Sequence, residues 1–271
     1  YHGLNLIQNA EEMRQNILNL TIDYLAIGLD PLTSIIFKQS DVSAHTELAW
    51  IFDSITTMPY LMRAHAFKDA EAKDKEISVG TFNYPLLMAA DILLYDTDIV
   101  PVGQDQKQHV EYARDTAQKF NNIFMETFKL PESLIMKEVA IVPGIDGQKM
   151  SKSYGNTIPL FATREEIVKA VMSIVTDSSG EVPTNVYNIH KLLKAEPDLK
   201  QLYDENKGKY KILKEALIED LDAFIKPLRD KREVIAQNMA QVEAVLAQGA
   251  QKANVKAGAK LLTIKKNIGV L

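Results

Sequence analysis

Hydrophobic residues recur at helical spacing along most of this chain, and short β-rich segments separate them in its first half. Asn9, with Glu12 three residues later, is typical of a helix N-terminus, and Gly28 is typical of a helix end. Residues 1–7 resemble the end of a strand, and residues 34–38 (SIIFK) predict another. A strand, a helix and a strand in this order indicate a parallel sheet.

The alternation continues to about residue 160. A helix is predicted from Ser43, and another over residues 84–95, where Pro85 suits the first helical turn. Residues 98–102 and 138–141 predict two further strands. The stretch that follows the first of these strands predicts a helix with one apolar face, formed by Val110, Ala113, Ala117 and Phe120.

Beyond residue 160 the pattern is helical and carries no further β signal. A long apolar stripe is expected to lie in the core of this part, and it consists of Leu213, Leu217, Leu221, Phe224 and Leu228. We therefore expect an α/β fold, with a parallel-sheet domain over residues 1–160 and an all-helical domain over residues 161–271.

Composition narrows the function less than the motifs do. Of the 271 residues, 46% are hydrophobic and 25% charged, as in ordinary globular proteins. The absence of cysteine excludes disulfides and thiolate metal sites, and no apolar run approaches the roughly 18 residues of a membrane span. The net charge of −5 gives no global signal for nucleic acid. Near the C-terminus, Lys252, Lys256 and Lys260 share one helix face, which suits a solvated surface and an RNA backbone contact equally well.

One acidic residue, Asp91, lies within the otherwise apolar stretch 84–95. A buried carboxylate costs several kcal/mol unless it is hydrogen-bonded or paired. Tyr84 and Met88 lie seven and three residues before Asp91, so they share its helical face. This apolar wall with one acceptor would suit an aromatic ligand that carries one N–H. A bond from Asp91 to backbone N–H groups or to water is an alternative of about equal weight.

Strand 98–102 leads through Gly103, Gln104, Asp105 and Gln106 into the next helix. Open α/β sheets bind ligands beyond the carboxyl ends of their strands, and a helix N-terminus favours anions. The segment is therefore a candidate ligand-binding turn, although Asp105 is equally explained as a capping residue.

Residues 149–153 have the sequence KMSKS and follow a loop rich in glycine and proline. Lys149 and Lys152 place two compact charges with rotatable donors on this loop, and such charge clamps act on transferring phosphates. For any two lysines a solvated basic loop is the usual explanation. The complete string instead matches a signature of Rossmann-fold aminoacyl-tRNA synthetases.

Together with residues 84–95 and 98–109, this motif makes the whole chain resemble the bacterial tryptophanyl-tRNA synthetases. The resemblance implies a Rossmann-like catalytic domain followed by a helical anticodon-binding domain. It implies an enzyme that activates L-tryptophan with ATP and Mg2+ and then passes the aminoacyl group to tRNA(Trp). It also implies a cytoplasmic homodimer with no tightly bound cofactor and no membrane partner.

The resemblance assigns the amino-acid pocket to residues of the first 110 positions. Asp91 would accept the indole N–H of tryptophan, and Gln106 would lie near the amino group of the substrate. The remaining pocket residues would line or hold the substrate, and they are His2, Tyr84, Met88, Val100 and Val102.

The resemblance assigns ATP to two segments. Gly103, Gln104 and Asp105 would meet the ribose and adenine, as would the backbone near Ala140 and Ile141. The KMSKS loop would stabilise the triphosphate through Lys149 and Lys152 and pack Met150 near the adenine, and Ser151 and Ser153 complete it.

Two features depart from the family pattern. The HIGH-type signature that normally precedes the position of His2 is not present, and His45 and His65 lie in other contexts. The first strand and its ATP-cradling helix are therefore expected to be missing, and the chain alone is expected to show little tryptophan-dependent ATP–pyrophosphate exchange. A family lysine is replaced by Ala70, for which Lys73 is a candidate substitute. Two alternative functions stay open, namely tyrosine activation and a catalytically inactive fragment that acts as a binding module.

Overall fold

The structure is a computed structural model, and it describes residues 1–63, 67, 76–136, 142–176 and 180–271. Two compact units make up the chain. The first comprises residues 1–21, 30–136 and 240–271, and the second comprises residues 22–29 and 137–239. The boundary expected near residue 160 would separate a catalytic domain from an anticodon-binding domain. This boundary stays a prediction.

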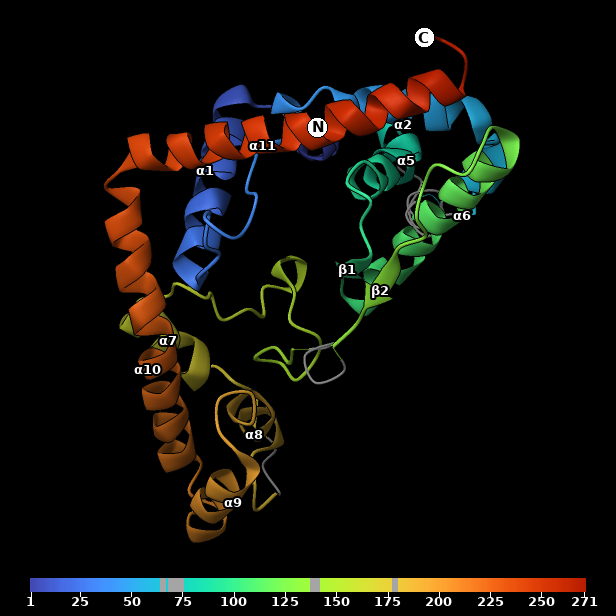
Figure 1. Ribbon diagram of the computed structural model, residues 1–271. Coiled ribbons are helices and arrows are strands. Elements are labelled where there is room, and N and C mark those ends of the chain that lie inside the picture. Colours follow the sequence, from blue (N-terminus) through green and yellow to red (C-terminus); the bar gives the residue numbers. More distant parts are fainter. Residues whose placement is uncertain (64–66, 68–75, 137–141, 177–179) are drawn as a thin grey trace. The chain divides into compact units, whose positions relative to one another are not determined.

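The first unit is mainly helical and contains a small sheet (Figure 1). Helix α1 (Ala10–Ile27) begins in this unit. The other helices are α2 (Ala44–Ile55), α3 (Met58–Leu61), α5 (Val79–Leu93), α6 (Lys107–Ile123) and α11 (Met239–Asn267). The strands are β1 (Ile99–Pro101) and β2 (Glu132–Leu134), and the short 3-10 helices are η1 (His2–Asn5), η2 (Gln39–Asp41) and η3 (Gln104–Gln106).

Strands β1 and β2 pair in parallel, with Ile99 opposite Glu132 and Pro101 opposite Leu134. Helix α6 connects them, so the expected parallel sheet is confirmed (Figure 1), whereas the strand–helix–strand unit predicted over residues 1–38 is wrong. The position of the second strand was not predicted, and residues 138–141 lie outside the described part of the chain.

Two segments predicted as strands adopt other conformations. Residues 1–7 contain η1, in which the Leu4 N–H donates to the Tyr1 carbonyl at 3.0 Å, so the backbone is paired locally and not along a sheet. Residues 34–38 are irregular. The backbone of Ile36 lies against Gly249 of α11, where a Cβ atom would come within 1.8 Å of the Ile36 carbonyl oxygen. Close packing against a helix therefore takes the place of strand pairing.

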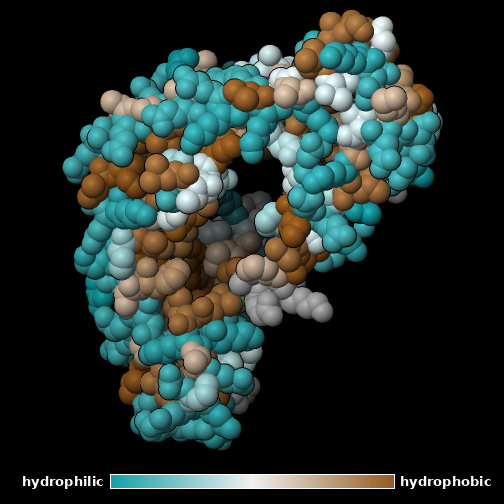
Figure 2. Space-filling view, viewed as in Figure 1, coloured by the Kyte–Doolittle hydropathy of each residue, from teal (hydrophilic) through white to brown (hydrophobic). Residues whose placement is uncertain are grey.

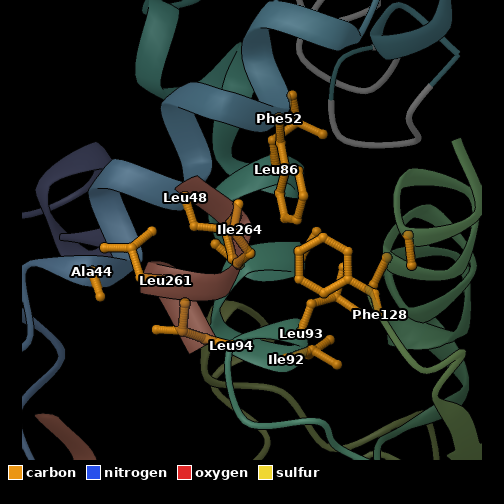
Figure 3. Packing of buried hydrophobic residues seen from close by; sticks show 14 of the residues in the cluster. Ala44, Leu48, Phe52, Leu86, Ile92, Leu93, Leu94, Phe128, Leu261 and Ile264 are labelled. Atoms are coloured by element: carbon orange, nitrogen blue, oxygen red, sulfur yellow. The ribbon is translucent and has the colours of Figure 1, made fainter. Parts of the chain in front are cut away.

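The core of the first unit forms where α2, α5, α6 and α11 meet. Figure 3 shows Leu48 and Phe52 of α2 beside Leu86 of α5 and Ile264 of α11. Helix α5 is buried at the centre of this cluster. The apolar face predicted for α6 is confirmed, because its members are almost fully buried: Val110, Ala113, Ala117 and Phe120.

Helix α5 begins earlier than the sequence pattern indicated. Ser78 caps it, because the Ser78 Oγ atom accepts the N–H of Thr81 at 3.1 Å. Pro85 consequently lies inside the helix and not in its first turn. The helices predicted from Asn9 and Ser43 begin where they were expected, and the Asn9 side chain accepts the N–H groups of Glu11 and Glu12 at 2.9 and 3.0 Å.

The lysine face of α11 divides into two kinds of residue. Lys252 and Lys256 are exposed, and Figure 2 shows hydrophilic side chains over most of the visible outer surface of α11. Lys260 is largely buried, pairs with Asp96 and donates to the Thr127 carbonyl at 2.6 Å. Lys260 therefore fixes α11 to the first unit. The prediction that the three lysines share one surface is wrong for Lys260.

The second unit holds α7 (Arg164–Met172), α8 (Thr184–His190), α9 (Glu196–Glu205), α10 (Tyr210–Ala236) and the 3-10 helix η5 (Lys152–Tyr154). Its core includes Leu217 and Leu221 of the predicted stripe. Phe224 of the same stripe is 53% exposed, so the stripe turns away from the core within α10. In the part of the chain that the structure describes, no helix is both long and apolar enough to cross a membrane.

Candidate active site

The Asp91 carboxylate lies at the centre of a hydrogen-bond cluster in the first unit. Its Oδ1 atom accepts from Gln39 Nε2 at 2.7 Å and from His45 Nδ1 at 2.6 Å. Its Oδ2 atom lies 3.0 Å from His2 Nε2. The side chain of Asp91 is 28% exposed, so a ligand can still reach it. The structure thus confirms the partly buried acceptor and shows that side chains, not backbone groups, surround it.

Asp91 is ionised at neutral pH because its partners outweigh its burial. Burial by itself raises the pKa of a carboxyl group. Hydrogen bonds from His2, His45 and Gln39 act in the opposite direction, and the pKa of Asp91 lies below its ordinary value. The site therefore presents a negatively charged acceptor to any ligand donor.

His45 is held on both of its ring nitrogens. Its Nε2 atom lies 2.8 Å from the Tyr95 hydroxyl, while Nδ1 contacts Asp91. Because an ionised carboxylate only accepts, His45 Nδ1 carries a proton and donates it to Asp91. Burial, followed by the charge of Asp91, raises the pKa of Tyr95, so the hydroxyl stays protonated. The Tyr95 hydroxyl thus holds the second ring nitrogen of His45.

A second cluster links Tyr84 to Gln106. The Tyr84 hydroxyl lies 2.5 Å from His109 Nε2, and His109 Nδ1 lies 2.9 Å from Gln106 Oε1. His109 is buried and belongs to the first turn of α6. The rings of His2 and Tyr84 meet edge-on with centroids 6.2 Å apart, which connects this cluster to Asp91. The structure therefore brings His2, Tyr84, Asp91 and Gln106 together.

Apolar residues and the turn after β1 complete this part of the site. Met88 and Val100 are half-buried against the core of the first unit. The Val102 N–H donates to the Leu134 carbonyl at 3.0 Å, which extends the pairing beyond β1. Gly103 precedes η3 and is exposed, as is Gln104. Asp105 lies within η3, and Ala140 and Ile141 lie outside the described residues.

The KMSKS loop belongs to the second unit. Lys149 pairs with Pro143 in an antiparallel bridge, and the Met150 N–H donates to the Val142 carbonyl at 2.8 Å. Lys152 is exposed at the start of η5, which ends at Gly155 with a positive φ of 65°. The loop is therefore a hairpin-like turn that leaves the Lys152 ammonium in solvent.

Asn156 fixes the shape of this loop. Its Oδ1 atom accepts the Ser151 N–H at 2.7 Å, and its Nδ2 atom donates to the Lys149 carbonyl at 3.0 Å. Nδ2 also donates to Asp146 Oδ1 at 2.8 Å, and this bond is the main cause that lowers the pKa of Asp146. Asn156 is almost completely buried and thus ties Lys149 and Ser151 of the motif to the preceding turn.

Comparison with known proteins shows the family to which this chain belongs. The family model for tRNA synthetases class I (W and Y) matches residues 3–258. The chain belongs to this family. It is 45% identical over 280 residues to a tryptophan–tRNA ligase of Fusobacterium nucleatum, and the alignment covers 100% of this chain and 86% of that protein.

A relative and a solved structure from Campylobacter jejuni are similar to this class I synthetase to a comparable degree. The chain is 43% identical over 279 residues to a tryptophan–tRNA ligase, with 100% of this chain and 88% of the relative covered. The crystal structure of a tryptophanyl-tRNA synthetase complexed with ADP and tryptophan superposes with a TM-score of 0.91 at 42% identity, covering 99% of this chain and 87% of that one. The resemblance predicted from the motifs is confirmed, as is a Rossmann-like catalytic fold with a helical part.

Sequence patterns missed the side chains that hold the synthetase site in place. The sequence context of His45 differs from that of the HIGH-type signature, and the motifs assign no role to His109 or Asn156. A signal existed for both histidines. His45 precedes the buried Leu48 by three residues, and His109 precedes the buried Ala113 by four. Each is therefore a polar residue on the buried face of a helix, where it needs a partner.

Proposed function

We propose that this chain is a tryptophan–tRNA ligase, which activates L-tryptophan with ATP and transfers it to tRNA(Trp). The observation that carries the proposal is Asp91, an ionised acceptor on a largely apolar helix face that also presents Tyr84 and Met88. An indole ring offers a flat apolar surface and one N–H donor, which this surface complements. The identity of 45% to a tryptophan–tRNA ligase supports the same substrate.

The pocket is completed by residues with separate roles. Gln106 would bind the substrate ammonium through its amide oxygen, which His109 already orients at 2.9 Å. Val100 and Val102 would line the indole, and His2 would close the pocket beside Tyr84. A site that pairs a substrate N–H discriminates strongly against analogues that lack it, because the buried acceptor is then left without a donor.

The first reaction step is an attack of the tryptophan carboxylate on the α-phosphorus of ATP. A P–O bond to the carboxylate forms and the bond to pyrophosphate breaks, which yields tryptophanyl-adenylate. A hydroxyl of the tRNA 3′ end then attacks the activated carbonyl and AMP leaves. Such transfers depend mostly on positioning and electrostatic stabilisation.

ATP would be held by the turn after β1 and by the KMSKS loop. Gly103, Gln104 and Asp105 would meet the ribose and adenine. Lys149 and Lys152 would neutralise the charge that develops as pyrophosphate leaves, and Met150, Ser151 and Ser153 would shape the loop against the nucleotide. Mg2+ would arrive bound to the phosphates of ATP, as part of the substrate.

We also infer that the enzyme is a homodimer. Trp50 of α2 is 72% exposed, and Met58 of the neighbouring α3 is 67% exposed. Large exposed apolar side chains such as these are candidates for an association surface. Sedimentation velocity of the full-length protein tests this, and the substitution Trp50→Lys is expected to shift the population toward monomers.

Tryptophan-dependent ATP–pyrophosphate exchange by the full-length protein tests the proposed function. Exchange is expected with tryptophan and not with tyrosine. Asp91→Ala is expected to weaken tryptophan binding by about 1–3 kcal/mol, the cost of losing a buried acceptor. Asp98→Ala, which removes an exposed carboxylate paired with Lys129, is the matched control and should leave binding unchanged. Exchange with tyrosine in place of tryptophan would contradict the proposal, as would unaltered tryptophan binding in Asp91→Ala.

A further inference from the structure

We propose that His45 is a positioning residue for indole recognition, which fixes the Asp91 carboxylate so that Oδ2 is the oxygen that accepts the indole N–H. The inference rests on the proposed function, because it concerns how Asp91 meets its ligand. It goes further by assigning the two carboxylate oxygens to different tasks and by naming the side chain that keeps them apart.

The assignment follows from the acceptor capacity of the two oxygens. Each oxygen of an ionised carboxylate accepts about two hydrogen bonds. Oδ1 already accepts from Gln39 at 2.7 Å and from His45 at 2.6 Å. Oδ2 is contacted by His2 at 3.0 Å. Among the described contacts, the remaining acceptor position therefore lies on Oδ2.

The direction of Oδ2 agrees with this assignment. His2, which contacts Oδ2, meets the Tyr84 ring edge-on at 6.2 Å. Oδ2 is thus linked through His2 to the Tyr84 ring of the wall proposed for the indole. Oδ1 is instead linked through His45 to Tyr95. A ligand stacked on Tyr84 is therefore expected to meet Oδ2 first.

His45 is the donor best suited to hold this orientation. It is 2% exposed, whereas the side chain of His2 is 36% exposed. Its ring packs against Phe37 at 5.8 Å and Tyr95 at 5.5 Å between centroids. Rotation of the ring would break its bonds to Asp91 and to Tyr95 together. Side chains that are locked by packing and by a second hydrogen bond keep a binding group in its productive geometry.

Calorimetric titration of the full-length protein with two ligands tests the inference. The ligands are L-tryptophan and benzothienylalanine, an analogue in which sulfur replaces the indole N–H. His45→Leu is expected to lower the affinity for tryptophan about tenfold or more. The affinity for the analogue should change less than about threefold, because the analogue makes no N–H bond to Asp91.

Two conservative variants extend the test. His45→Asn keeps an N–H close to the position of Nδ1 and is expected to recover most of the preference for tryptophan over the analogue. Tyr95→Phe removes the hydroxyl that holds the Nε2 atom of His45, so an intermediate loss of that preference is expected. These two variants carry the test if His45→Leu does not fold, since His45→Asn keeps a polar group at this position and Tyr95→Phe keeps the aromatic ring.

The outcomes separate the inference from the proposed function. A parent protein that does not prefer tryptophan to the analogue overturns both. If Asp91→Asn abolishes the preference for tryptophan over the analogue, while every His45 and Tyr95 variant keeps that preference, the inference alone is overturned. Equal losses for both ligands in His45→Leu, without recovery in His45→Asn, likewise show a purely structural role for His45 and overturn the inference.

Discussion

Asp91 collects its hydrogen-bond donors from distant parts of the chain, because His2, Gln39 and His45 lie 89, 52 and 46 positions away from it. A lone carboxylate on an apolar helix needs such partners, since an unpaired buried charge is costly. Helical or strand periodicity relates residues that are close in sequence, so it carries no information on such pairs.

Asn156 supports a prediction about the lysine loop. In Asn156→Ala the Ser151 N–H and the Lys149 carbonyl lose their hydrogen bonds to this side chain, which is expected to destabilise the loop conformation by about 1–3 kcal/mol. The maximal rate of ATP–pyrophosphate exchange is expected to fall about tenfold or more, since the backbone at Lys149 is no longer fixed by Asn156. The affinity for tryptophan, measured by calorimetry without ATP, should stay unchanged.

A surface asparagine provides the control for this prediction. Asn122 is exposed on α6 and accepts a hydrogen bond from Gln118, so Asn122→Ala should leave the exchange rate unaltered. An Asn156→Ala protein with the parental exchange rate would show that the loop keeps its shape without this side chain.

Secondary-structure elements were predicted unevenly, and the difference has a physical cause. Long helices such as α6 bury a regular face, and the pattern of four buried apolar residues located it. The strands are three residues long, which is too short for an alternating pattern to appear. Residues 34–38 have strand-like composition but pack against α11, a contact that depends on Gly249 and is invisible in the local sequence.

Two glycines of α11 give a matched test of that contact. A Cβ atom on Gly249 would lie 1.8 Å from the Ile36 carbonyl oxygen, whereas a Cβ atom on Gly258 meets nothing within 4 Å. Gly249→Ala is expected to destabilise the first unit by about 1–3 kcal/mol, as overpacking does. Gly258→Ala is expected to stabilise it by up to about 1 kcal/mol through helix propensity.

Urea unfolding of both variants, followed by far-UV circular dichroism, measures these changes. The opposite signs are the informative feature, because intrinsic propensity alone favours alanine at both positions. If Gly249→Ala proved as stabilising as Gly258→Ala, the segment around Ile36 would have to move freely away from α11.

The chain consists of two units with separate cores, and the local sequence pattern does not indicate that α11 belongs to the first unit. The C-terminal helices look alike in their local pattern, so the pattern alone does not show which core each one joins. Lys260 is an example: it appeared to belong to a lysine face, yet it joins α11 to Asp96 and Thr127 of the first unit. Tertiary contacts therefore override the local signal.

The separate cores lead to a prediction on pH. His190 of the second unit is fully buried, with Nε2 2.6 Å from Asp220 and Nδ1 3.3 Å from the Tyr203 hydroxyl. Burial lowers the pKa of His190, and Asp220 offsets this only in part. The unfolded chain therefore binds a proton below a pH of about 6.5, while the folded unit does not. Stability of the second unit should fall as the pH drops through 6.5 and level off below the folded pKa.

Hydrogen exchange measured by mass spectrometry at pH 5 to 8 would follow each unit separately. Protection factors, corrected for intrinsic exchange, are expected to decrease with falling pH in α8 and α10. The substitution His190→Gln should flatten this pH dependence, because glutamine keeps a donor for Asp220 and does not titrate. Helix α5 of the first unit provides the internal reference, since protonation of His190 acts on the core that holds it. Parallel pH profiles for α8 in the parent and in His190→Gln would exclude His190 as the titrating group and would place the acid sensitivity of this unit elsewhere.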